Sequence, residues 1–188
     1  MADAFRERTA RLLTDYLEYC AREPGTAPRQ PSSPEAAVLR CVAAQIREYN
    51  VRTLSVYRGF RWNRVELVAW MAQKLLASPR GPNWYRVASL LTFAGMLLER
   101  HPREACGRKK EGNVSRDCRL LVALLCAQLS GQHRTWLLAN GGWVDSFFNA
   151  IRYTFPLDSA ALQVGAHQPK NFRMKRQPLS CSTSLRKG

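Results

Sequence analysis

The chain has 188 residues, of which 46% are apolar and 10% aromatic, and this composition excludes wholesale disorder because it can supply a hydrophobic core. Its 29 Lys and Arg residues against 14 Asp and Glu give a net charge of +15, which favours anionic partners or surfaces without specifying a fold. The N-terminus lacks the apolar segment of a secretory signal, and the longest apolar run, residues 120–127, is far shorter than the roughly 20 residues of a membrane span. We therefore expect an intracellular, cytoplasmic protein with no transmembrane anchor.

The first half of the chain has helical periodicity. Apolar residues at helix spacing predict an amphipathic helix at residues 4–22. Residues 24–33 are rich in proline and are expected to form a flexible linker. Ser33, followed by a proline and an acid, has the pattern of a helix N-terminus, so a second helix is expected to start there and to present its apolar face as far as Tyr49. A short helix is predicted at residues 52–58.

The second half contains the most apolar segments. A helix is predicted at residues 63–77, and it ends before a Pro- and Gly-containing break. Residues 83–100 are apolar on nearly every side, which is typical of a helix that other helices surround. A second strongly apolar helix is predicted at residues 113–130.

Two short helices are expected at residues 132–139 and 143–152, because the Asn-Gly-Gly sequence between them favours a helix end and a change of chain direction. No segment shows the sustained alternation of a strand, so we predict an all-α bundle of seven or eight helices at residues 1–156. Residues 157–188 are polar and basic and are expected to be disordered.

The sequence contains none of the common catalytic or nucleotide-binding motifs. The three histidines, His101, His133 and His167, are far apart and are not accompanied by cysteines, so they do not predict a metal site. The six cysteines form no Cys-x-x-Cys pair and are expected to be reduced thiols. We predict that the protein is not an enzyme and needs no cofactor.

Two local sequences nevertheless stand out. Residues 83–95 read NWYRVASLLTFAG and place Arg86 two positions after Trp84, at the start of the most apolar helix. Alone, this pattern also fits a cation that extends from a core helix to the solvent. Residues 135–147 read TWLLANGGWVDSF, which alone also fits a turn between two helices with two core tryptophans.

Together, about 50 residues apart, these sequences resemble the first and second BH (Bcl-homology) motifs of the Bcl family of apoptosis regulators, and the likeness is strongest to a divergent member. The family patterns are close to Asn-Trp-Gly-Arg and Trp-x-x-x-Asn-Gly-Gly-Trp-x-x-Phe. Residues 8–19 resemble the N-terminal fourth motif, and the resemblance covers about residues 5–157. The residues that match structural positions of the motifs are Trp84, Gly95, Trp136, Asn140, Gly141, Gly142, Trp143 and Phe147.

The resemblance implies a bundle around a central apolar helical hairpin, with a surface groove that binds the amphipathic death-motif helix of a pro-apoptotic partner. The groove is expected between the helix that starts after Ser33, the 63–77 helix and the first half of the 83–100 helix. Its predicted apolar walls are Val42, Ile46, Val68, Met71, Leu75, Val87, Ala88 and Phe93. The alternative for some of these residues is that they belong to the core.

The resemblance also assigns polar roles. Arg86 matches the family arginine that pairs with an aspartate of the ligand helix, and Asn83 could donate a further hydrogen bond. Tyr85 stands where the family usually has glycine, so its ring is expected to narrow or re-route the groove. Ala43 and Ala44 replace the Gly-Asp of a functional death motif, which favours a receptor over a death ligand.

The implied function is regulation of apoptosis, most simply a pro-survival one that restrains mitochondrial outer-membrane permeabilisation by binding Bax/Bak-like or death-motif-only proteins. Family membership also implies hetero- or homodimers and association with the mitochondrial outer membrane or endoplasmic reticulum. The basic tail suggests peripheral contact with anionic membranes. Alternatives are a pro-apoptotic or mixed role and, in another class, a polybasic binder of nucleic acid or membrane surfaces. The basic residues lack aromatic interleaving, so no nucleic-acid partner is expected.

Overall fold

The computed structural model describes residues 3–57, 63–77, 79, 81–99 and 111–143. Over these ranges the chain forms helices and no strands, which confirms the predicted all-α fold. The elements are α1 (Ala4–Ala21), α2 (Pro34–Tyr49), α3 (Val51–Ser55), α4 (Arg64–Leu76), α5 (Trp84–Leu98), α6 (Glu111–Ala127), a π-helical segment η3 (Gln128–Gln132) and α7 (Arg134–Ala139). The predicted helix at 143–152, with Phe147, and the tail at 157–188 lie outside the described residues, apart from Trp143.

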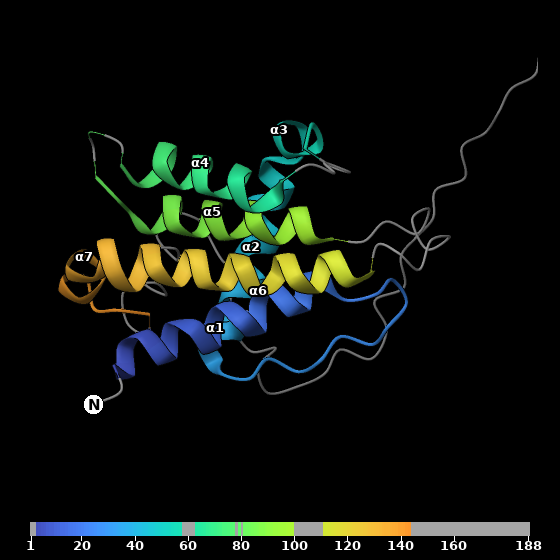
Figure 1. Cartoon of the computed structure of the whole chain (residues 1–188), viewed down its shortest axis with the longest axis horizontal. Coiled ribbons are helices and arrows are strands. Elements are labelled where there is room, and N and C mark those ends of the chain that lie inside the picture. The colour runs from blue at the N-terminus through green and yellow to red at the C-terminus, as the bar shows by residue number, and fades with distance from the viewer. Residues whose placement is uncertain (1–2, 58–62, 78, 80, 100–110, 144–188) are drawn as a thin grey trace, which may run out of the picture.

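The helices are layered around the α5–α6 pair (Figure 1). In this view α4 lies on one side of the pair and α1 on the other, while α2 lies against α5. No helix in the described ranges is both long and apolar enough to cross a membrane.

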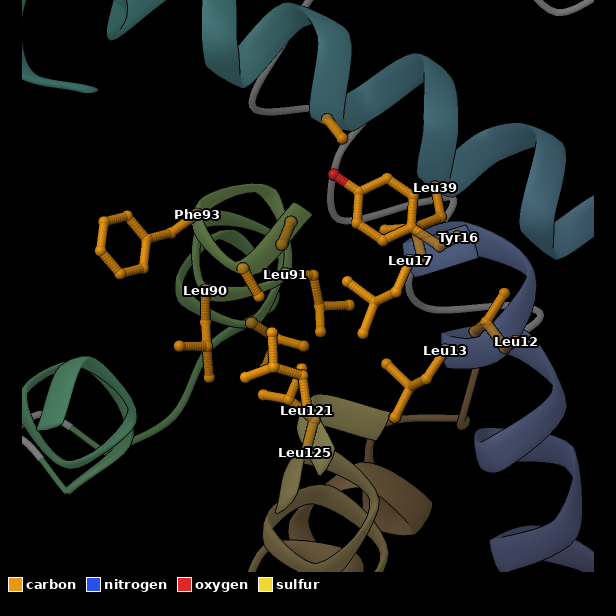
Figure 2. Close-up of a cluster of buried hydrophobic side chains, with 14 of the residues drawn as sticks. Leu12, Leu13, Tyr16, Leu17, Leu39, Leu90, Leu91, Phe93, Leu121 and Leu125 are labelled. Carbon is orange, nitrogen blue, oxygen red and sulfur yellow. The ribbon is translucent and has the colours of Figure 1, made fainter. Parts of the chain in front are cut away.

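Helix α5 is the centre of the core, as its uniform apolarity predicts. Every residue from Leu90 to Leu98 is buried. Figure 2 shows the leucines that surround it, which come from three other helices: Leu13 and Leu17 of α1, Leu39 of α2, and Leu121 and Leu125 of α6. Each buried leucine contributes about 1.5–3 kcal/mol relative to an exposed one, so burial of this cluster stabilises the fold.

Side-chain caps set the starts of four helices, and at α1 the Asp3 carboxylate accepts from the Arg6 N–H at 3.3 Å. The Ser33 hydroxyl accepts a hydrogen bond from the backbone N–H of Ala36 at 3.2 Å, which confirms the predicted start of α2. Asn63 and Asn83 cap α4 and α5 in the same way. Each cap satisfies a backbone donor that the first turn of a helix leaves unpaired.

Residues 24–33 contain no helix, and two hydrogen bonds attach the end of this segment to the bundle. The backbone N–H of Ser32 donates to the Asp15 carboxylate at 2.8 Å, and Arg40 donates to the Arg29 carbonyl at 2.7 Å. The flexibility expected for this linker stays a prediction.

Ion pairs connect elements that are distant in sequence. Five arginines take part in the pairs Arg8–Glu35, Arg40–Asp15, Arg47–Glu99, Arg64–Asp117 and Arg134–Asp3. The Arg40 and Asp15 side chains are nearly buried, at 11% and 7% exposure, so water screens their attraction less than that of the exposed pairs. These carboxylates therefore neutralise part of the positive charge of this strongly basic chain.

Candidate functional site

The N-terminus of α5 carries the first motif. Asn83 has an extended backbone, and its side-chain oxygen accepts a hydrogen bond from the Arg86 N–H at 2.8 Å. The oxygen of Asn83 therefore has a capping role, and its exposed side chain keeps its amide donors for another partner. The predicted role of Asn83 in partner binding stays a prediction.

Trp84 turns inward and joins the two motifs. It is 5% exposed, and its ring lies 5.2 Å from that of Trp136 and 5.6 Å from that of Trp143, between ring centroids. Trp143 is itself 2% exposed and donates from Nε1 to the Thr9 hydroxyl of α1 at 2.9 Å. Segments about 50 residues apart thus meet in one aromatic cluster.

The Asn-Gly-Gly sequence makes this meeting possible. Gly141 and Gly142 have φ values of +74° and +65°, in the left-handed region that glycine adopts without a steric penalty. The N–H of Gly142 donates to the Leu137 carbonyl at 2.8 Å, and the side chain of Asn140 donates to the Trp136 carbonyl at 2.8 Å. These contacts end α7 and change the direction of the chain, as the sequence predicts, and the next residue, Trp143, contacts α1.

Gly95 allows α1 to approach α5 closely. A Cβ atom at this position would lie 2.7 Å from Cys20 Sγ and 2.8 Å from the Tyr16 hydroxyl. Burial raises the pKa of the Cys20 thiol to about 12. The described cysteines, Cys20, Cys41, Cys118 and Cys126, are free thiols.

Arg86 is half-buried at the start of α5, with its guanidinium outside the tryptophan cluster. Its Nη1 donates to the Gly81 carbonyl at 2.6 Å. In the part of the chain that is described, no carboxylate pairs with Arg86. This differs from the five arginines above, whose charges are balanced within the bundle.

The predicted apolar walls divide into two groups. Six of them are core residues with at most 2% exposure: Val42, Ile46, Val68, Val87, Ala88 and Phe93. Met71 and Leu75 of α4 are half-buried and pack at the edge of the core. Of the eight predicted wall residues, the α4 pair therefore retains accessible surface, whereas the other six are almost completely buried.

Phe93 is the buried wall residue with a distinct position. Figure 2 shows its ring on the side of α5 that faces away from α1 and from Leu13 and Leu17. The Tyr57 ring, just beyond α3, covers it edge-on, with ring centroids 5.2 Å apart and an interplanar angle of 88°. The ring of Tyr57 therefore occupies space that an apolar group of a partner would need in order to contact Phe93.

The structure also exposes large apolar side chains that our sequence reasoning did not select as site residues. They lie on the same helices that border the predicted groove, or next to them: Tyr49, Val51, Val56 and Trp70. Tyr49 was predicted to share the apolar face of α2, yet it is 71% exposed because α2 ends at this residue. Trp70 lies away from the Val68, Ala72 and Leu76 face of α4, and this departure from the core period is the signal that could have identified it.

Tyr85, the departure from the family pattern, is 39% exposed. Its backbone belongs to the first turn of α5, so the helix accepts this side chain where the family has glycine. The predicted effect of its ring on a groove stays a prediction.

Sequence comparisons agree with the motif resemblance. The profile of the apoptosis regulator proteins of the Bcl-2 family matches residues 37–143. A human protein called Bcl-2-like protein 10 is 53% identical over 167 residues, covering 84% of this chain and 81% of that protein. The anti-apoptotic protein NR13 of Japanese quail (Coturnix japonica) is 32% identical over 147 residues, covering 76% of each chain.

Solved structures show the same fold. The solution structure of a divergent Bcl-2 protein is 41% identical, with a TM-score of 0.68, and the match covers 84% of this chain and 95% of that one. The crystal structure of the zebrafish pro-survival protein NRZ in complex with Bad BH3 has a TM-score of 0.60 at 22% identity, and the match covers 80% and 95% of the two chains.

Proposed function

The chain belongs to the Bcl-2 family of apoptosis regulators, and we propose that it is a pro-survival member that binds the death-motif (BH3) helices of pro-apoptotic family proteins. The binding region is bordered by α2, α4 and the first half of α5. By holding Bax/Bak-like or death-motif-only partners there, the protein restrains permeabilisation of the mitochondrial outer membrane. Two proteins support a pro-survival, BH3-binding role: the relative NR13, which is anti-apoptotic, and the structural neighbour NRZ, which binds Bad BH3.

One observation carries the proposal: the half-buried Arg86 guanidinium has no carboxylate partner among the described residues. A planar guanidinium can hold a carboxylate through two parallel hydrogen bonds, so an aspartate on a partner helix would balance this charge. Half-buried Met71 and Leu75 and exposed Trp70 provide apolar area on the neighbouring α4.

Apolar burial supplies most of the affinity in this scheme. Four apolar anchors of a ligand helix contribute about 6–12 kcal/mol in total when buried. Folding of a disordered ligand segment costs about 2–5 kcal/mol of that gain. The Arg86 pair then sets the register of the helix and the selectivity for partners with a correctly placed acid.

The test is Arg86→Ala with a synthetic Bad BH3 peptide. Loss of one partner of such a pair costs about 2–5 kcal/mol, so we expect at least about a tenfold loss of affinity in isothermal calorimetry. The matched control is Arg119→Ala, which removes the same charge from an exposed position beside the cavity between α1 and α6. Equal affinity of Arg86→Ala and wild type would contradict the proposal.

A separate test shows whether the protein is pro-survival or pro-apoptotic. A pro-survival protein delays cytochrome c release from isolated mitochondria exposed to a death-motif protein, and a pro-apoptotic one hastens it. The pro-apoptotic or mixed role is the alternative within the same fold, and it is favoured by the burial of six of the eight predicted wall residues. Hetero- or homodimers and association with the mitochondrial outer membrane or endoplasmic reticulum are further parts of the proposal.

A further inference from the structure

The loop before α5 holds Arg86 in a defined direction. The guanidinium Nη1 donates to the Gly81 carbonyl at 2.6 Å, while the backbone N–H of the same residue donates to Asn83 at 2.8 Å. A hydrogen bond from a charged donor is stronger than one between neutral groups. Both the main chain and the end of the side chain of Arg86 are thus attached to the segment that enters the helix.

The carbonyl that accepts this bond depends on a glycine. Gly81 has a φ of +70°, a left-handed conformation that residues with a Cβ rarely adopt. It also precedes Pro82, and the proline ring restricts any other residue at this position to extended backbone. A Cβ at Gly81 would meet no atom within 4 Å, so conformation rather than space is what requires glycine here.

We propose that Gly81 is a positioning residue for recognition of the partner's acid, an inference that rests on the proposed function. Its carbonyl occupies Nη1 and leaves Nη2 and Nε, which point to the other edge of the guanidinium, for the two oxygens of a carboxylate. Among the described residues the Gly81 carbonyl is the acceptor for this guanidinium.

Positioning before binding strengthens the pair in two ways. A side chain that is already held loses less rotational freedom when the ligand arrives. The free edge is also presented in one orientation, and the planar fork needs that orientation for two parallel hydrogen bonds. Selectivity for an acid, rather than affinity for apolar groups, is therefore the property that Gly81 controls.

The experiment measures this selectivity with a pair of peptides. One is a Bad BH3 peptide with its motif aspartate, and the other carries asparagine at that position. In wild type we expect the aspartate peptide to bind at least about tenfold more tightly. In Gly81→Val the backbone becomes extended and the carbonyl moves, so this ratio falls to about threefold or less. Affinity for the asparagine peptide stays the same, and Arg86→Ala brings the ratio to about one.

A matched control separates selectivity from general backbone strain. Gly25 also has a positive φ, of +89°, and free space around its Cα, but it lines the cavity beside Met96 and Glu99 at the opposite end of α5. Gly25→Val should leave the ratio at the wild-type value. Addition of Gly81→Val to Arg86→Ala should cause no further change in the ratio.

A second measurement uses the unliganded full-length protein. NMR of the arginine guanidinium groups, with the Arg86 signals assigned through Arg86→Lys, should show slowed rotation of the Nη1 group, because it is hydrogen-bonded. Free rotation in wild type would overturn the inference even if Gly81→Val does not fold.

Failure of the positioning role of Gly81 and failure of the proposed function give different outcomes. A wild-type ratio that persists in a folded Gly81→Val would overturn the positioning role and leave the proposed function intact. Failure of wild type to bind either peptide would overturn the proposed function and this inference with it. A wild-type ratio near one, with both peptides bound, would show that Arg86 does not read the acid and would equally overturn the inference.

Discussion

At Gly95, the close contact of α1 with α5 leaves no room for a side chain. We expect Gly95→Ala to lower the free energy of unfolding by about 1–3 kcal/mol, because the new methyl group would force Cys20 and Tyr16 away from the helix. Urea denaturation followed by circular dichroism measures the change.

The control for Gly95→Ala is Gly131→Ala, where a Cβ meets nothing within 4 Å. It should be neutral or should stabilise the protein, since alanine restricts the unfolded chain more than glycine does. If Cys20→Ala reduces the cost of Gly95→Ala, the sulfur contact is the cause. Equal stability of Gly95→Ala and wild type would show that α1 can shift without cost.

Because of Cys20, we expect the free energy of unfolding to change with pH in the alkaline range. Burial raises the pKa of its thiol from the usual 9.0 to about 12, so the folded protein keeps a proton that the unfolded chain loses. The stabilisation is fully present below pH 9 and is lost as the pH rises toward 12, by about 1.4 kcal/mol per pH unit for this one group.

Urea denaturation between pH 8 and pH 11 tests this effect. Cys20→Ala should lower stability at every pH, through lost packing, but its stability should fall less steeply above pH 9 than that of wild type. Tyr16, whose pKa burial also raises, contributes its own decline at higher pH in both proteins. Parallel curves for wild type and Cys20→Ala would rule out Cys20 as the source.

Among the elements, α3 is the least secured. It has five residues, no buried residue and no side-chain cap at its N-terminus. A helix of this length is unstable alone, so its position depends on neighbours such as the Tyr57–Phe93 ring contact. We expect Tyr57→Ala to speed hydrogen exchange of the α3 amides while the amides of α5 keep their protection.

The control for the α3 prediction is Leu138→Ala, which removes an apolar side chain that is 48% exposed on α7. It should leave exchange in α3 close to that of wild type. Slow exchange of α3 in Tyr57→Ala would mean that other contacts hold this helix. Loss of protection in α5 would instead mean that Tyr57 supports the core itself.

The helices that sequence predicted best are those with a cap and a clear period. Ser33 marks the start of α2, and the uniform apolarity of α5 identifies the central helix. The end of α6 was predicted less well. One helix was expected through Ser130, but α6 ends at Ala127 and the π-helical segment η3 begins at Gln128. There the Ser130 hydroxyl donates to the Cys126 carbonyl at 2.5 Å, a local bond that competes with regular helix geometry.

For the candidate site, sequence assigned the predicted residues to helices but could not give their exposure. Motif spacing placed Arg86 at the start of α5, whereas the burial of Val87 and Phe93 depends on how α2, α4 and the Tyr57 ring pack around that helix. Periodicity within one helix cannot distinguish a core residue from a groove residue, since both are apolar and lie on the same face. The role that we propose for Gly81 could not be predicted from sequence either, because it depends on a backbone angle and on a hydrogen bond of the Arg86 guanidinium.

At the scale of the whole molecule, the two motifs depend on each other. The cluster of Trp84, Trp136 and Trp143 joins the start of α5 to the segment after α7, and Trp143 also bonds to Thr9 of α1. The N-terminus, the centre and the C-terminal part of the described chain therefore meet at one point. A change in any of the three elements should reach the segment that presents Arg86.

The net charge of +15 leads to a prediction about membranes. Residues 161–188 contain six basic residues and no acid, whereas several arginines of the bundle are paired with carboxylates. Because each basic residue near an anionic lipid surface contributes about 1 kcal/mol, these six should dominate binding to phosphatidylserine vesicles.

A variant of the whole chain with glutamine at all six positions should bind these vesicles at least about tenfold more weakly at low salt. Binding of the wild type should weaken as salt screens the charges. Vesicle sedimentation measures both effects, with neutral phosphatidylcholine vesicles as the control. Unchanged binding of the variant would place the membrane contact on the helical bundle instead.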